Sequence, residues 1–201
     1  FTPSGELECA IQRAEAGVAP KVVSVPGQVE VGTGSPRDER GRTRDQVGPE
    51  SGKATDRTRR HGPGPRCARC PRMVTLRKER RTASPEDWNR PVPAVGPVDA
   101  RLLIVGLAPG AQGANRTGIP FLGDSSGDTL RRAMRASRIP EERVRITNVV
   151  KCLPPANRPT GDELQNCRSW FAREMRDLAR TGSGVVLALG RVAHTCLLYT
   201  S

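Results

Sequence analysis

The chain has 201 residues, which is enough for one domain of ordinary size with an additional tail. Its 33 Lys and Arg against 21 Asp and Glu give a formal net charge of +12 at pH 7, which excludes an acidic surface and favours a polyanion such as nucleic acid as a partner. It contains no run of about 18 apolar residues and no secretory pattern at its start, so we expect a soluble, cytoplasmic protein without a membrane span. An arginine-rich composition inherited from GC-rich coding DNA would give the same charge.

Residues 1–63 are predicted to form a disordered tail. They hold 10 of the basic and 9 of the acidic residues and no aromatic after Phe1, so a net charge of +11 lies on residues 64–201. They are rich in Gly, Pro, Ser and Thr without helical or strand periodicity, and they cannot bury enough apolar surface to offset the entropy of ordering. Because the first methionine is Met73, this segment also reads as upstream DNA translated in frame.

Strands are predicted to alternate with helices from about Cys67 onward. A stretch of helix-favouring residues follows Cys67, and a proline-rich connection leads to Arg101–Leu107 (RLLIVGL), an apolar run of buried-strand length that ends in a Gly/Ala/Pro loop. The further elements are a helix that begins at Ser125 or Ser126, either of which can cap it, and runs to about Ser137, a strand over residues 144–150, a helix from Gly161 to Arg180 and a strand from Val185 to Leu189. This order predicts an α/β fold, a three-layer α/β/α domain over residues 64–201 with a central, mainly parallel sheet.

Four of the six cysteines form a candidate metal site. Cys67 and Cys70 make a CxxC pair, and Cys152 and Cys167 are a second pair close behind the second strand. Four soft sulfur ligands suit a tetrahedral zinc or an iron–sulfur cluster, and spacing alone does not choose between them or exclude a chance arrangement. Cys9 and Cys196 lie in the tail and near the end of the sequence, so we leave both out of the site.

The loop after the first strand is the second candidate site. Residues 106–127 (GLAPGAQGANRTGIPFLGDSSG) are rich in glycine, which permits a ligand to approach the backbone closely. The loop lacks the GxGxxG spacing of a dinucleotide site and the Gly-Lys-Ser/Thr ending of a phosphate-binding loop, which disfavours a flavin- or nucleotide-binding protein.

Four segments together resemble the iron–sulfur uracil-DNA glycosylases of family 5. GLAPGAQGANRTGIPFLGD is similar to the family's first motif and ITNVVKCLPPANRPTGDELQNC to its second strand and cluster segment, while DWNRPVP and CARCPRMV resemble the lead-in and the amino-terminal cysteine pair. The resemblance covers roughly residues 64–195. Family 4 is the nearest relative, but its first loop carries acidic residues, whereas none lies between Pro109 and Phe121 and the first carboxylate is Asp124.

The resemblance implies a DNA repair enzyme that hydrolyses the N-glycosidic bond of uracil, or of other deaminated bases, in DNA. It implies a [4Fe-4S] cluster held by the four cysteines, with zinc as the alternative, in a monomeric protein that contacts DNA. A rival from another class is a non-catalytic, metal-stabilised module that binds nucleic acid.

Three side chains match base-handling positions of that family. Phe121 would stack on the flipped base, or alternatively anchor the loop in the core. Asn148, at the end of the second strand, can donate and accept at uracil's Watson–Crick edge, or bond only to nearby backbone. Asp124 would orient water or stabilise a positively charged sugar, or cap the following helix.

The remaining loop residues are assigned to binding. The backbone N–H groups from Gly110 through Ala111 and Gln112 to Gly113 would face the base's carbonyl oxygen, and Asn115, Arg116, Ser125 and Ser126 would fix the loop or contact a phosphate. Gln112 stands where the family usually has histidine, and Ile119 where it has arginine. His194 matches a helical, structural position, and His61 receives no role.

The sequence also predicts a domain that is truncated at its carboxyl end. In the family a histidine that stabilises the departing base lies in a loop after a further strand, and neither histidine of this sequence matches it. We therefore expect little or no glycosylase activity from these 201 residues, and an unpaired sheet edge beside the last strand.

Overall fold

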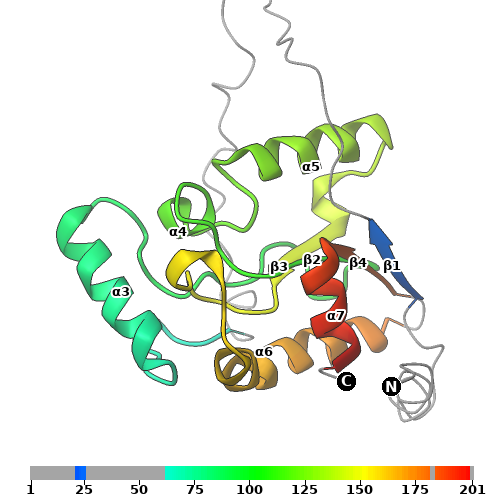
Figure 1. Ribbon diagram of the computed structural model, residues 1–201. Coiled ribbons are helices and arrows are strands. Elements are labelled where there is room, and N and C mark those ends of the chain that lie inside the picture. Colours follow the sequence, from blue (N-terminus) through cyan, green and yellow to red (C-terminus); the bar gives the residue numbers. More distant parts are fainter. Residues whose placement is uncertain (1–20, 26–61, 182–183, 200–201) are drawn as a thin grey trace, which may run out of the picture.

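The computed structural model describes residues 21–25, 62–181 and 184–199, and it contains one parallel sheet (Figure 1). The strand order is β1-β4-β2-β3. The strands are β1 (Lys21–Val25), β2 (Leu102–Gly106), β3 (Val144–Asn148) and β4 (Val185–Leu189). All three pairings between neighbours are parallel, as predicted for the strands after residue 64.

Helices cover both faces of this sheet. They are α3 (Pro71–Ala83), α4 (Ala114–Thr117), α5 (Ser125–Ala136), α6 (Gly161–Ala179) and α7 (Arg191–Tyr199), with short 3-10 turns at Glu141–Arg143 and Pro155–Asn157. In Figure 1, α5 lies on one side of the sheet and α6 and α7 on the other, while α3 lies beyond the sheet on the side away from β1. None of the described helices is long and apolar enough to cross a membrane.

Two apolar clusters hold the layers together, and alternating residues of β2 point to each. Ile104 packs with Leu130 and Met134 of α5, whereas Leu103 and Val105 face the opposite cluster, which includes Phe171, Leu178 and Leu197 of α6 and α7. Because both faces of the strand are covered, β2 reads as a continuous apolar run, and its three central residues are at most 1% exposed. The predicted three-layer α/β/α architecture is confirmed.

One strand lies where none was predicted. β1 falls in the segment assigned to a disordered tail, and it pairs in parallel with β4, with Lys21 opposite Val185 and Val25 opposite Leu189. Within the described residues β4 therefore has a strand on each side, which differs from the unpaired edge expected after the loss of a further strand. The five residues KVVSV are rich in β-branched valine, but a strand this short is stabilised by the backbone of its neighbour, which no local pattern reveals. Residues 1–20 and 26–61 lie outside the described part of the chain, so for them the tail remains a prediction.

Candidate functional site

The carboxyl ends of β2 and β3 bring three sequence-predicted residues into contact. Gly106 and Asn148 are register partners at the ends of these strands. A Cβ atom added to Gly106 would lie 2.5 Å from Oδ1 of Asn148 and 2.6 Å from Cζ of Phe121. The ring and the amide therefore stand side by side over a position that only glycine leaves open, and they form one wall of a candidate base site.

Phe121 is held in an unusual backbone conformation. Its φ of 54° lies in the left-handed region that non-glycine residues rarely adopt. Its carbonyl oxygen accepts a hydrogen bond from Arg131 of α5. The ring is half-buried and packs against the cluster beneath α5, so it both anchors the loop and leaves an exposed surface.

Asn148 is 4% exposed, and its side chain has unused hydrogen-bonding capacity. Within the described residues, no hydrogen bond uses its side-chain amide, whereas its backbone carbonyl accepts from Lys151 Nζ at 2.7 Å. Its amide atoms do not belong to the fully buried side-chain atoms that lack a partner, so they can be reached by another molecule. This geometry suits a ligand that offers both a donor and an acceptor.

Asp124 occupies the N-cap of α5. Its carboxylate accepts from the backbone N–H of Gly127 at 2.9 Å, so the cap is Asp124 itself and not Ser125 or Ser126, both of which are exposed in the first turn. The carboxylate also packs against the glycines of the loop, because a Cβ at Gly110 would lie 3.3 Å from Oδ2. It is half-buried and faces the loop that the sequence assigned to base binding.

The loop backbone turns tightly beside that carboxylate. The carbonyl of Gly110 accepts from the Asn115 N–H and that of Gly113 from the Arg116 N–H, each at 3.0 Å. No hydrogen bond found among the described residues uses the N–H groups of residues 110–113, so these donors stay available. Ala111 is half-buried, and Gln112 is exposed while its carbonyl accepts from Arg116 Nε at 3.0 Å.

Asn115 is turned into the protein. It is 4% exposed, and its Nδ2 donates to Oδ1 of Asn89 at 2.8 Å. Asn89, fully buried with a φ of 43°, in turn donates to the carbonyls of Ser84 and Arg80 at 2.8 and 3.2 Å. The pair ties the loop to the end of α3. Sequence reasoning noted the DWNRPVP segment but missed this role of its asparagine.

The four predicted cysteines line one small cavity of about 10 Å³. Cys67 precedes α3, Cys70 is its N-cap residue, Cys152 follows β3 and Cys167 lies in α6. All four are free thiols, and all but Cys67 are buried. Across the described residues, no group of three or more His, Cys, Asp or Glu side chains is arranged to hold a metal ion.

Burial and mutual proximity set the acidity of these thiols. Burial raises the pKa of Cys152 to about 12, and the neighbouring Cys167 acts in the same direction while Arg77 opposes it. Burial also raises the pKa of Cys70 and of Cys167. Neighbouring thiolates repel one another, so a cation at their centre would reverse this preference and bind them deprotonated.

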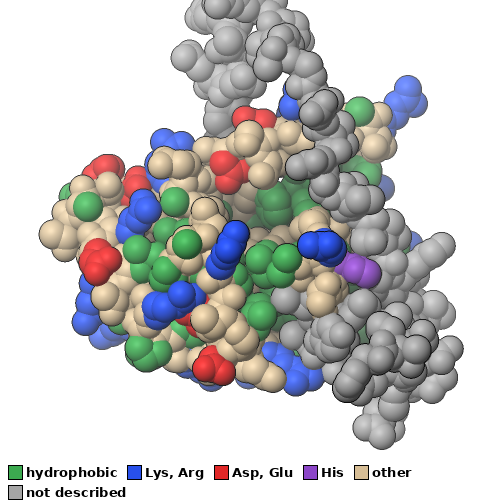
Figure 2. Space-filling view, viewed as in Figure 1, with side chains coloured by type: hydrophobic (Ala, Val, Ile, Leu, Met, Phe, Trp, Pro, Cys, Tyr) green, Lys and Arg blue, Asp and Glu red, His purple; other side chains and the backbone are tan. Residues whose placement is uncertain are grey.

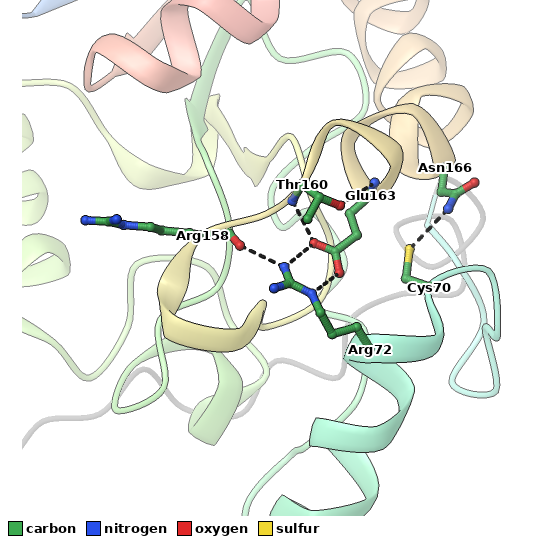
Figure 3. Close-up of polar contacts among 6 residues, drawn as sticks. All are labelled: Cys70, Arg72, Arg158, Thr160, Glu163 and Asn166. Carbon is green, nitrogen blue, oxygen red and sulfur yellow. Dashed lines mark hydrogen bonds and ion pairs between the residues drawn. The ribbon is translucent and has the colours of Figure 1, made fainter.

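Polar contacts fasten the cysteine segments to one another (Figure 3). Arg72 of α3 donates to both carboxylate oxygens of Glu163 in α6, at 3.0 and 2.8 Å, and Glu163 forms a capping box with Thr160. Asn166 Nδ2 lies 3.7 Å from the Cys70 sulfur. A further arginine of α3, Arg77, donates to the Cys67 carbonyl at 2.7 Å and lies 4.0 Å from the Cys152 sulfur.

A buried ion pair beneath Asn148 is the functional candidate that sequence reasoning missed. Lys151 and Glu174 are both 0% exposed, and Nζ lies 2.8 Å from Oε2. A lysine that follows a strand and a glutamate in an amphipathic helix ordinarily face water, so no local signal identifies this pair.

His194 lies on α7, where a helical position was expected, and the Cys196 side chain lies outside the described residues.

The family model and the individual relatives to which the chain is similar all describe uracil-DNA glycosylases. A family model described as the uracil DNA glycosylase superfamily matches residues 93–200. The chain is 41% identical over 149 residues to a type-5 uracil-DNA glycosylase of Pyrobaculum aerophilum, which covers 66% of this chain and 65% of the relative. A type-5 enzyme of Thermus thermophilus is also 41% identical over 149 residues, with 66% and 67% covered. A type-4 enzyme of Thermotoga maritima is 37% identical over 124 residues, with 60% and 62% covered. The chain thus spans about two thirds of the length of these relatives.

Proposed function

The chain belongs to the uracil DNA glycosylase superfamily, and from that premise we propose that it supplies the base-binding and cysteine-rich parts of an enzyme that releases uracil from DNA. The observation that carries this proposal is the junction at Gly106, where a half-buried ring and an amide with no side-chain hydrogen bond among the described residues stand side by side. A planar base needs both a stacking surface and an edge that donates and accepts. Phe121 and Asn148 meet these two needs from separate segments of the chain.

Each step of base release has a candidate group at this site. Phe121 stacks on the flipped base, and the Asn148 amide pairs with the adjacent acceptor and donor of uracil. The free N–H groups of residues 110–113 face the base's carbonyl oxygen, where negative charge develops. Asp124 stands behind this loop, where its carboxylate orients water or stabilises the positively charged sugar.

DNA that contains uracil or another deaminated base is the proposed partner, bound by a monomer. Residues 64–201 carry the net positive charge that a polyanion requires. On the face shown in Figure 2, Lys and Arg side chains are interspersed with Asp and Glu, so the charge is not gathered in one patch there. Exposed Arg116, beside the base site, is placed to contact a phosphate.

We infer that the cysteine site holds a [4Fe-4S] cluster, with zinc as the alternative. All four cysteines line one cavity, although they come from three separate segments of the chain. Four soft thiolate ligands suit either group, and the resemblance to iron–sulfur relatives favours the cluster. Cys67, Cys70, Cys152 and Cys167 would hold the cluster, whose contribution is structural, and the chain's own Arg77 and Asn166 would donate to the ligating sulfurs.

Asn148→Ala tests the proposed function in a chimera, in which this chain replaces the matching part of the Thermus thermophilus relative. We expect the variant to slow single-turnover uracil release by about 10²-fold or more while its affinity for undamaged DNA stays within about twofold, because base reading is local and phosphate contacts dominate affinity. Equal losses in both would contradict the assignment. A folded chimera that binds DNA but releases no uracil would instead favour a non-catalytic, metal-stabilised nucleic-acid-binding module.

A further inference from the structure

The buried ion pair of Lys151 and Glu174 lies directly beneath the base-reading asparagine. The ammonium of Lys151 donates to Oε1 and Oε2 of Glu174 at 2.9 and 2.8 Å. It also donates to Thr147 Oγ1 at 2.6 Å and to the backbone carbonyl of Asn148 at 2.7 Å. Its three N–H groups are therefore all used, and two of their acceptors belong to the last two residues of β3.

Stability alone does not explain this arrangement. Two charges with no exposed side-chain surface are costly to remove from water, and their mutual attraction does little more than offset that cost. Apolar residues of similar volume commonly replace such pairs without loss of stability. We therefore look for the role of this pair in the positions of the groups that it contacts, and not in the free energy of folding.

The contacts of Lys151 fix the position of the Asn148 backbone. The bond to the Asn148 carbonyl holds the peptide group after that residue, and with it the place of the backbone from which the side chain leaves the strand. The side chain has no hydrogen bond of its own among the described residues, so its place depends on its own backbone and on packing beside Gly106. On the neighbouring strand, a Cβ atom added to Gly106 would contact both the Asn148 Oδ1 atom and the Phe121 ring.

The same two residues connect this position to the cysteine site. Lys151 immediately precedes Cys152 in the chain. Glu174 lies two helical turns beyond Cys167 in α6, with its side chain on the buried face. Displacement of α6 or of the Cys152 segment would therefore be transmitted to the carbonyl of Asn148.

We propose that Lys151 and Glu174 are positioning residues, which hold the Asn148 amide at the angle needed to read the edge of a uracil and couple that angle to the cysteine segments. This inference rests on the proposed function. It adds that recognition of uracil depends on a salt bridge that never touches the base.

The experiment compares the chain with its double variant Lys151→Met/Glu174→Leu, in which both charges are removed together. The probes are two oligonucleotide duplexes that carry 2′-fluoro-deoxyuridine or 2′-fluoro-deoxycytidine opposite thymine, because the fluorine blocks bond cleavage and neither base has its usual partner. The ratio of the two dissociation constants measures how well the base edge is read. We expect the variant to retain its fold and its affinity for undamaged DNA, but to lose about tenfold or more of the uracil preference, as expected for one lost bidentate base contact.

Two further variants exclude general damage. Leu178→Ala removes a core side chain from the same helix, at 3% exposure, and should lower stability while leaving the uracil preference intact. In an Asn148→Ala background the double variant should cause no additional loss, because it acts through Asn148. If the double variant fails to fold, Thr147→Val, which removes one partner of Lys151 with little change of shape, must still reduce the preference.

The outcomes separate the inference from the proposed function. A wild-type chain that binds both duplexes equally would refute the proposed function and this inference with it. A wild-type preference that survives unchanged in Lys151→Met/Glu174→Leu would overturn the inference alone. An additive loss in the Asn148→Ala background would also overturn it, because the ion pair would then act elsewhere.

Discussion

Gly106→Ala gives the sharpest test of the base site, because the change is a single methyl group at its centre. The added Cβ would lie 2.5 Å from Asn148 Oδ1 and 2.6 Å from Phe121 Cζ, so the amide and the ring must move apart. Both obstructing atoms belong to side chains, and the Phe121 ring is only half-buried. The backbone of β2 should therefore persist while the junction opens.

The magnitude follows from two opposing effects. Overpacking a buried site costs about 1–3 kcal/mol. Alanine also lowers the conformational entropy of the unfolded chain, which stabilises the folded state by about 0.4–1 kcal/mol, because Gly106 is in an extended strand conformation that alanine adopts readily. We expect a net destabilisation of roughly 1–2 kcal/mol, together with a loss of about 10²-fold in single-turnover uracil release, because a displacement of about 1 Å at a reacting site has that effect.

Urea unfolding of the chain and uracil release by the chimera measure the two quantities. Gly161→Ala is the matched control, because a Cβ there meets no atom within 4 Å at the start of α6, and it should leave both values near wild type. If Gly106→Ala released uracil at the wild-type rate despite the measured destabilisation, the junction would not be the base site. If it changed neither quantity, the packing argument itself would be wrong.

Three other predictions follow from the described contacts. Asp124→Asn should keep the cap and the stability but slow uracil release by about 10²-fold or more, whereas Asp124→Ala should also lose about 1 kcal/mol of stability; a wild-type rate in the asparagine variant would leave Asp124 only the capping role. Anaerobically purified chain should contain about four irons and four sulfides and lose them in Cys152→Ala but not in Cys9→Ala, and stoichiometric zinc without iron would contradict this. The hydrogen bonds from Arg72 hold the pKa of Glu163 below its usual 4.5, so its ionised form stabilises the fold above that pH and the contribution disappears as pH falls through the lower folded-state pKa. The unfolding free energy of Glu163→Gln should therefore depend less on pH below about 4.5 than that of the wild type, and parallel curves in urea titrations would argue against the pair.

The sequence by itself determined the architecture. Burial on both faces requires continuous apolar strands, so residues such as Leu103, Ile104 and Val105 identify β2 without any knowledge of its neighbours. The four cysteines were also selected from the sequence, as a CxxC pair and two cysteines behind the second strand, and the structure places all four around one cavity. The roles of Phe121, Asn148 and the cluster remain predictions that the experiments above will test.

Only the tertiary structure decided how these residues meet. The register that sets Gly106 beside Asn148 is a property of two paired strands, and the left-handed turn that brings Phe121 over them depends on Arg131 of a later helix. The strand β1 exists because β4 offers it a backbone partner. Local patterns report whether a residue is buried, whereas they do not report its partner, because partners are chosen by packing between distant segments. For the same reason Lys151 and Glu174, which read as surface charges, proved to be the most deeply buried ions of the described chain.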